Sequence, residues 1–273
     1  PYVRGRERSV PLNEIIHDVK QYVEKGYKEI ILLGQNVNSY GKDFENGDNF
    51  AKLLEEICKV EGDFLVRFIS PHPRDFSDEV IDVIAKNDKI AKSLHLPLQS
   101  GSTRILKMMN RGYTKEQYIA LAEKIKEKIP GVALTADIIV GFPGESEADF
   151  LDTLDVVKRI QFENSFMFMY SIRQGTKAAD MKEQIDLEIK KERLQRLIEI
   201  QNSCSLAESE TYRGKTVRIL VEGESKKNKD VLTGRTSTNK IVLFKGDKTL
   251  EGTFANVKIN DCKTWTLYGE IVD

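Results

Sequence analysis

Five short polar segments, each following an apolar run, hold most of the residues that could do chemistry in this 273-residue sequence. Their glutamine, asparagine, serine, histidine and arginine side chains can bind a polar ligand, and their glycines allow close backbone approach. The segments are Gly34–Asn36, Ser70–Pro73, Gln99–Ser102, Gly141–Gly144 and Ser171–Gly175. Any one of them could be a plain turn. Five such segments favour a ligand site if the fold brings them to one edge.

The apolar runs before these segments predict five buried parallel strands, each followed by a segment of helical periodicity. The predicted strands span 27–33, 64–69, 92–98, 132–140 and 163–170. Helices are predicted to begin near residues 50, 76, 103, 114 and 147, after a leading helix over 11–25. Parallel α/β folds place ligand sites at the carboxyl ends of their strands, so the five segments should share one rim.

The end of the chain has a different character. A long charged helix is predicted over 186–212, and residues 213–273 form short β-type runs between glycine and polar turns. About five such strands predict a small closed or nearly closed β-barrel, a shape often used to bind oligonucleotides. These last residues hold 12 Lys/Arg against 8 Asp/Glu, whereas the whole chain has a net charge of −1. The tail is therefore the better candidate for binding a polyanion.

Several classes of protein are disfavoured. No apolar run is long enough to span a membrane and no signal peptide is present, so we expect a cytoplasmic location. Cys58, Cys204 and Cys262 are scattered without CxxC spacing, which fits a reducing compartment. The GxGxxG, P-loop, HExxH and GxSxG motifs are absent from the sequence, which argues against common nucleotide-binding and hydrolase sites.

Seven strings, taken in order, carry a family resemblance. They are PYVRGRERS at 1–9, LLGQNVNSYG at 32–41, ISPHPRDF at 69–76, HLPLQSGSTRILKMMNRGYT at 95–114, DIIVGFPGESEADF at 137–150, YSIRQGT at 170–176 and LTGRTSTNKIVLFKG at 232–246. Together they resemble the radical-SAM tRNA methylthiotransferases over essentially the whole chain. The last string is similar to the heart of a TRAM domain, the RNA-binding module of that family. The PYVRGRERS and SPHP variants resemble the branch that acts on isopentenylated tRNA adenine.

The resemblance implies an α/β fold of three parts. These are an incomplete parallel (β/α) radical-SAM barrel over 1–185, a connecting helix over 186–212 and an all-β TRAM-type barrel over 213–273. In the family a CxxxCxxC motif stands immediately before the residues that match Pro1 and Tyr2, and this chain has no such motif. We therefore expect a fragment that lacks the cluster loop, the first barrel strand and the amino-terminal domain, and that is inactive without them.

For the intact enzyme, the resemblance implies radical methylthiolation of C2 of N6-isopentenyladenine next to the tRNA anticodon. Its cofactors would be S-adenosyl-L-methionine and two 4Fe–4S clusters. We expect this chain to hold neither cluster. Its partners would be the anticodon loop of tRNA and an electron donor such as a flavodoxin or ferredoxin. One alternative is a methylthiotransferase acting on a ribosomal-protein aspartate or threonylcarbamoyl-adenine. Another is a non-catalytic RNA-binding protein, which reading the residues encoded before Pro1 would distinguish.

The resemblance also suggests residues that contact S-adenosylmethionine at the rim. Gly34, Gln35 and Asn36 would lie near the methionyl amino group, although a tight turn is an equally ordinary role. Gln99 and Ser100 would hydrogen-bond the ribose or the carboxylate. Alternatively, they cap the helix that follows them.

Four further positions complete the expected cofactor site. Arg111 would pair with the methionyl carboxylate, the strong charge-assisted contact that a guanidinium offers. Ile138, Ile139 and Gly141 would pack on or approach the adenine, with glycine permitting a backbone contact. A buried strand that ends in a turn explains the last three equally well.

RNA contacts are expected from basic residues at both ends of the chain, where they could meet phosphates. They are Arg4, Arg6, Arg8, Arg213, Lys215, Arg218, Arg235 and Lys240. Each alone could belong to a solvated charged face. Tyr40 and Phe244 are candidate platforms on which unpaired bases would stack.

Overall fold

Strands and helices alternate through the first part of the chain, as predicted. The computed structural model describes residues 7–226 and 228–272. The strands are β1 (Glu29–Leu32), β2 (Leu65–Phe68), β3 (Ser93–His95), β4 (Ala133–Val140) and β5 (Asn164–Met169). The helices are α1 (Leu12–Glu24), α2 (Phe50–Cys58), α3 (Asp78–Lys86), α4 (Thr103–Met108), α5 (Lys115–Lys128) and α6 (Glu147–Ile160).

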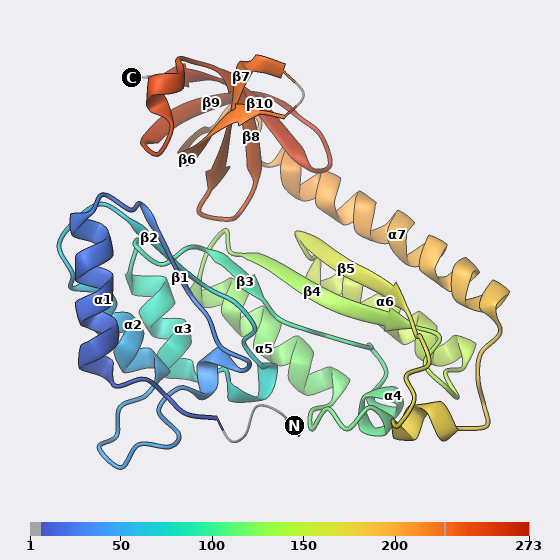
Figure 1. The fold of residues 1–273 in the computed structure, drawn as a ribbon. Coiled ribbons are helices and arrows are strands. Elements are labelled where there is room, and N and C mark those ends of the chain that lie inside the picture. Colours follow the sequence, from blue (N-terminus) through green and yellow to red (C-terminus); the bar gives the residue numbers. More distant parts are fainter. Residues whose placement is uncertain (1–6, 227, 273) are drawn as a thin grey trace.

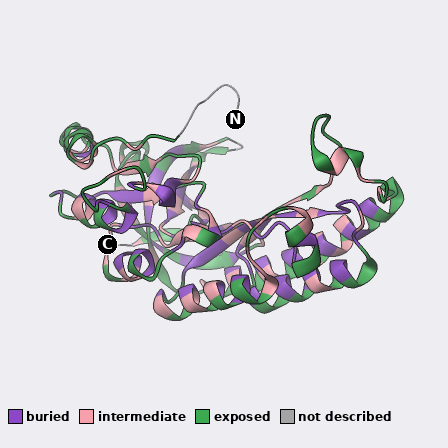
Figure 2. Cartoon of the chain, turned by 90° about the horizontal axis from the view of Figure 1, so that it is seen from below, coloured by how far each residue is buried: buried purple, intermediate pink, exposed green. Residues whose placement is uncertain are grey.

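The five strands form one curved row of parallel strands. β1 pairs with β2, and β3, β4 and β5 pair in that order, all parallel. A single parallel bridge between Val66 of β2 and Ile90 links the two groups. The helices lie on one side of the row, with their buried faces toward it and their exposed faces outward (Figures 1 and 2). The predicted incomplete parallel barrel is confirmed.

The core lies between the strands and the helices, and β4 shows how its two faces differ. Its residues alternate between buried and half-exposed along the strand. Leu134 and Ile138 belong to the hydrophobic core, whereas Thr135, Asp137 and Ile139 lie on the opposite face. Because helices cover only one face, the strands are not apolar on both sides. We call the space on the opposite, concave face the lumen.

A long helix leads to a second barrel. Helix α7 (Leu187–Glu210) packs beside β5 and α6 and ends at five further strands (Figure 1). These are β6 (Thr216–Ser225), β7 (Asn228–Thr236), β8 (Ile241–Lys245), β9 (Phe254–Cys262) and β10 (Thr266–Val272), closed in the order β10-β8-β7-β6-β9. The barrel has its own core around Val221, Val242 and Leu267. The predicted β-barrel is confirmed. No helix in the described part of the chain has the length and hydrophobicity needed to cross a membrane.

Candidate functional site

A cavity of about 250 Å³ lies at the carboxyl ends of the first strands. We call it the rim cavity. Its walls come from the predicted polar segments after β1, β2 and β3 and from nearby side chains. The lining residues are Gln35, Ser70, Pro71, His72, Pro73, His95, Pro97, Gln99, Arg111, Tyr113 and Asp137. The structure thus brings Gln35, Gln99 and Arg111 together, as expected. The segments Gly141–Gly144 and Ser171–Gly175 do not line this cavity.

Arg111 presents an unsatisfied donor in the rim cavity. Its Nε atom is buried and has no hydrogen-bond acceptor among the described residues. A buried donor without a partner costs roughly 1–3 kcal/mol, and more when it is charged. Because Arg111 lines the rim cavity and a guanidinium can hold a carboxylate through two parallel hydrogen bonds, an anionic ligand is a suitable occupant of this cavity.

Two backbone positions at the rim are strained. Gln99 and Ser70 have φ values of 66° and 59°, a region that non-glycine residues rarely adopt. Gln99 is held there because its N–H donates to the Asp137 carbonyl and its carbonyl accepts from the Ile139 N–H. Its side chain is buried and lines the rim cavity. Strained residues of this kind concentrate at functional sites, so both positions support a ligand role for the rim.

Asn36 joins two rim loops instead of facing the rim cavity. Its Nδ2 atom donates to Asp75 Oδ2 at 2.6 Å, and Lys42 Nζ lies 2.7 Å from the other oxygen of that carboxylate. Burial alone would raise the pKa of Asp75, but hydrogen bonds from Arg74, Lys42 and Asn36 hold it well below its usual range. A Cβ on Gly34 would lie 3.2 Å from Val37 Cα, which indicates a tight turn. Of the predicted triplet, Gln35 lines the rim cavity, while the buried Asn36 Oδ1 has no hydrogen-bond donor among the described residues. The cofactor contacts of all three residues stay predictions.

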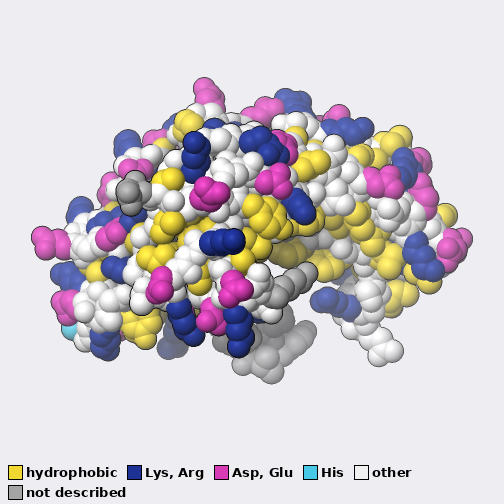
Figure 3. Space-filling view, turned by 90° about the horizontal axis from the view of Figure 1, so that it is seen from above, with side chains coloured by type: hydrophobic (Ala, Val, Ile, Leu, Met, Phe, Trp, Pro, Cys, Tyr) yellow, Lys and Arg dark blue, Asp and Glu magenta, His cyan; other side chains and the backbone are white. Residues whose placement is uncertain are grey.

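Below the rim cavity lies a larger one of about 580 Å³, which we call the lumen cavity. It shares Ser70, His95 and Asp137 with the rim cavity, so the two adjoin. His95 Nδ1 lies 3.0 Å from Thr135 Oγ1, and its Nε2 lies 3.3 Å from Asp137 Oδ2. The sequence analysis singled out neither His95 nor Asp137, although polar residues alternate along β4. Figure 3 shows hydrophobic side chains gathered across the middle of the face on the side of the second barrel.

The second barrel closes the far end of the lumen with its β7–β8 turn. Arg67 of β2 donates through Nη1 to the Ser237 carbonyl at 3.0 Å and through Nη2 to the Thr236 carbonyl at 2.8 Å. Lys240 forms an ion pair with Glu163 in which both side chains are almost fully buried. The prediction that Lys240 contacts a phosphate is therefore wrong, because this buried lysine holds the two barrels together.

Ser100 and Ile138 line neither the rim cavity nor the cavity below it, so the geometry does not support the cofactor contacts expected of them. Ser100 is fully buried, and its Oγ accepts from the Ser102 N–H at 3.2 Å. The helix cap is Ser102, whose side chain accepts from the Ile105 N–H. Ile138 is fully buried in the core on the helix side of β4. Its neighbour Ile139 lies on the lumen face instead.

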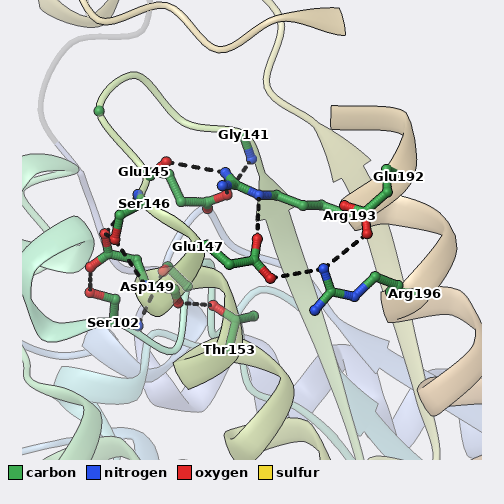
Figure 4. Close-up of polar contacts among 12 residues, drawn as sticks. Ser102, Gly141, Glu145, Ser146, Glu147, Asp149, Thr153, Glu192, Arg193 and Arg196 are labelled. Atoms are coloured by element: carbon green, nitrogen blue, oxygen red, sulfur yellow. Dashed lines mark hydrogen bonds and ion pairs between the residues drawn. The ribbon is translucent and has the colours of Figure 1, made fainter. Parts of the chain in front are cut away.

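Gly141 is required by helix packing. Its φ is 71°, and a Cβ would lie 2.4 Å from Cγ of Lys190 in α7, so the space that glycine leaves is filled by that side chain. The Gly141 N–H donates to Glu145 Oε1 at 2.9 Å, and Arg193 Nη1 lies 2.8 Å from the same oxygen (Figure 4). Burial raises the pKa of Glu145, against the effects of these two donors. These contacts fix the loop in place, and the expected approach of the Gly141 backbone to an adenine stays a prediction.

The predicted RNA-binding residues are distributed over several surfaces. Arg4 and Arg6 lie outside the described residues, and Arg8 is exposed beside β1. Lys215 is exposed and has no ion pair in the parts of the chain described here.

Three other predicted RNA contacts are already ion-paired. Arg213 pairs with Glu210 at 2.7 Å, Arg235 pairs with Glu222 at 2.7 Å, and Arg218 pairs with Asp63. All three remain partly exposed. The stacking platform predicted at Phe244 is wrong, because this ring is buried in the second barrel. The hydroxyl of Tyr40 donates to the Val10 carbonyl at 2.9 Å, and stacking on the Tyr40 ring stays a prediction.

The cysteines do not fit an iron–sulfur cluster. Cys58, Cys204 and Cys262 are free and lie in α2, α7 and β9. Within residues 7–226 and 228–272, no group of three His, Cys, Asp or Glu residues could hold a metal ion. Burial raises the pKa of all three thiols, which disfavours the thiolate form that iron requires.

The incomplete barrel that carries the rim cavity and the β-barrel that follows it each match a known protein family. The model of the radical SAM superfamily matches residues 1–157, and that of the TRAM domain matches residues 210–272. The chain belongs to the radical SAM superfamily and carries a TRAM domain, as the sequence strings indicated. Coproporphyrinogen III oxidase (HemN) from Escherichia coli, a radical SAM enzyme, shares the fold. It is 12% identical, with a TM-score of 0.52 over 83% of this chain and 60% of that one.

Two curated relatives are much more similar in sequence. Each is described as a tRNA-2-methylthio-N(6)-dimethylallyladenosine synthase. The one from Fusobacterium nucleatum is 75% identical over 272 residues, and the one from Moorella thermoacetica is 54% identical over 273 residues. Both alignments cover 100% of this chain and 62% of the relative, so the chain spans about three fifths of their length.

Proposed function

We propose that this chain forms the cofactor-binding barrel and the RNA-binding barrel of an enzyme that methylthiolates C2 of N6-isopentenyladenine next to the tRNA anticodon. The names of the relatives that align along its whole length support this reaction. The structural observation that carries the proposal is the rim cavity. It is lined by Arg111, whose buried Nε has no acceptor among the described residues, and it adjoins the lumen cavity through His95 and Asp137.

S-adenosylmethionine fits the residues of the rim. Arg111 would bind its carboxylate, Gln35 and Gln99 would hydrogen-bond its other polar groups, and Ile139 would offer apolar contact from the lumen face. When bound, this cofactor supplies the one-electron hydrogen abstraction and the methyl group. The residues that the structure describes offer no ligand set for the two 4Fe–4S clusters, so we place the clusters elsewhere in the intact enzyme, with a flavodoxin or ferredoxin as the electron donor.

The residues of the lumen have a positioning task in this proposal. The C2–H of adenine is too weakly acidic for a side-chain base such as His95 or Asp137 to remove near neutral pH, so acid–base catalysis alone does not suffice. The chain would instead orient the base beside the rim cavity and exclude water from it, while the cofactor does the difficult chemistry.

The test expresses the complete gene that encodes this chain in bacteria that make isopentenyladenine in tRNA but cannot methylthiolate it. Mass spectrometry of tRNA nucleosides should detect the 2-methylthio product with the wild-type protein. The product should disappear with Arg111→Ala and persist with Arg159→Ala, an exposed arginine on α6. Unchanged isopentenyladenine, with sulfur found instead on threonylcarbamoyl-adenine or on a ribosomal-protein aspartate, would overturn the proposal in favour of a related enzyme. No product of any kind, with RNA still bound, would favour a non-catalytic RNA-binding protein.

A further inference from the structure

Two aromatic rings line the lumen cavity from opposite barrels and remain about half exposed. Phe166 of β5 is 53% exposed, and Trp265, just before β10, is 45% exposed. Large apolar side chains exposed in a concavity commonly mark a ligand site. Their flat faces suit a planar ring as occupant, because aromatic rings stack with offset or edge-on geometry. The His95 ring already lies edge-on to Phe166, with centroids 6.2 Å apart.

The charges around the lumen cavity favour a base over a phosphate. Its lining cations, Arg67, Arg235 and Lys240, are all held in ion pairs, with Glu29, Glu222 and Glu163 respectively. A phosphate entering this cavity would have to compete with a carboxylate for each cation.

Polar side chains beside the rings can hydrogen-bond the edge of a base. Asn239 is exposed at the cavity, and its Oδ1 accepts from Arg235 Nη1 at 3.2 Å, which leaves the donors of its amide available. Asn164 also lines the wall, whereas the hydroxyl of Thr238 is already hydrogen-bonded to those of Tyr212 and Thr236. Stacking faces next to such groups are the means by which proteins bind unpaired RNA bases.

The position of the lumen cavity connects it to the proposed reaction. It adjoins the rim cavity through Ser70, His95 and Asp137, and its outer wall belongs to the TRAM domain. Its volume of about 580 Å³ lies within the range of roughly 300–1,000 Å³ that is usual for ligand pockets. A strand of RNA held here would therefore lie between the RNA-binding barrel and the cofactor cavity.

We propose that the lumen cavity binds an unpaired nucleotide of the substrate RNA, whose base stacks on Trp265 with Phe166 as the second wall. The inference rests on the proposed function only in taking RNA as the substrate. In this proposal Trp265 is a positioning residue. The nucleotide would contact both barrels, because Trp265 belongs to the TRAM domain and Phe166 belongs to the radical SAM barrel.

Trp265 is the sole tryptophan of the chain, so its intrinsic fluorescence reports directly on stacking. The full chain is titrated with a stem-loop RNA that has an unpaired adenine-containing loop, and with a fully paired RNA duplex of equal length. The stem-loop should quench the fluorescence and the duplex should not. Anisotropy of labelled stem-loop should show binding weakened roughly five- to hundredfold by Trp265→Ala, as is usual for loss of one base-stacking ring.

Matched variants separate stacking from folding. Trp265→Tyr should restore most of the affinity, and Tyr22→Ala, which removes an exposed ring on α1, should leave it unchanged. The slope of affinity against salt should be the same for Trp265→Ala and wild type, because no phosphate contact is lost. Thermal unfolding followed by circular dichroism checks that each variant is folded.

The outcomes distinguish this inference from the proposed function. Tight stem-loop binding with unchanged fluorescence, and with Trp265→Ala binding as well as wild type, would overturn the lumen site while leaving RNA as the substrate. Equal quenching by duplex, or quenching by acidic peptides without RNA binding, would also overturn it. Absence of RNA binding by wild type would instead count against the proposed function.

Discussion

Lys240 and Glu163 form a buried ion pair that joins the two barrels of this chain. Their side chains are 2% and 9% exposed. Lys240 stands at the end of the β7–β8 turn, and Glu163 immediately precedes β5. Lys240 Nζ also donates to Ser209 Oγ of α7 at 2.6 Å. Burial raises the pKa of Glu163, and the charge of Lys240 opposes that effect. The pair thus fixes the second barrel against the wall of the lumen cavity, which both residues line.

Lys240→Met should destabilise the chain strongly, because it leaves the Glu163 carboxyl buried without a partner. Breaking one side of such a pair costs about 3–5 kcal/mol, whereas replacing both partners with apolar residues costs much less. The double variant Lys240→Met, Glu163→Leu should therefore be more stable than the single variant in urea unfolding. Single and double variants of equal stability would show that the pair is not coupled. RNA affinity should keep its salt slope in the double variant.

Arg111→Ala should weaken binding of S-adenosylmethionine, measured by equilibrium dialysis with the full chain. A hydrogen bond to a charged group contributes about 1.5–3 kcal/mol, so the dissociation constant should rise roughly 10- to 100-fold. Arg111→Lys should recover part of the loss, since it keeps the charge but not the two-pronged geometry. Arg159→Ala is the matched control. Equal dissociation constants for Arg111→Ala and wild type would remove Arg111 from the cofactor site.

The strands and helices were predictable because each is encoded locally. The continuous apolar runs before the polar segments gave all five parallel strands, and serine or threonine at a helix start gave caps, as with Thr114 before α5. The closed second barrel followed from short β-type runs between glycines. Its strand β9, which no quoted string contained, completes the closure between β6 and β10.

The orientation of individual side chains was less predictable. A continuous apolar run does not reveal which of two adjacent residues faces the helices, so Ile138 was placed in the site although Asp137 and Ile139 face the lumen. The role of Lys240 depends on Glu163, a partner from the other barrel that no local pattern indicates. Gly141 was singled out for a ligand contact, whereas the reason for glycine that the structure shows is the packing of Lys190 of α7, which no local pattern indicates.

Lys215→Ala should lower the salt dependence of tRNA binding. Lys215 is exposed at the start of the second barrel and has no ion-pair partner within the described ranges, so its charge is available to a phosphate. Loss of one phosphate contact should reduce the slope of log affinity against log salt by about 1. Lys20→Ala, an exposed lysine on α1, should leave the slope unchanged. A slope unaltered by Lys215→Ala would place the RNA on another face of the barrel.

Asp149→Asn should remove part of the acid sensitivity of the fold. The Asp149 carboxylate is nearly buried at the start of α6 and accepts from Ser102 Oγ at 2.6 Å and from the Ser146 N–H at 2.8 Å. Burial alone would raise its pKa, but hydrogen bonds from Arg104, Ser102 and Ser146 hold it well below the usual range. A carboxyl whose pKa is depressed by folding stabilises the fold above its unfolded pKa of about 3.9, and this contribution is lost as pH falls toward the folded value.

At pH 7 the free energy of unfolding of Asp149→Asn should therefore be lower than that of wild type, by about 1–3 kcal/mol. The difference should shrink as urea unfolding is repeated at lower pH, from about pH 5 downward, because wild type then protonates Asp149 and loses the same interactions. Asp155→Asn, which changes an exposed carboxyl on the same helix, should show no such convergence. If the gap between wild type and Asp149→Asn stays constant across this range, the ionised carboxylate of Asp149 does not support the start of α6, and its hydrogen bonds act equally well in the neutral form.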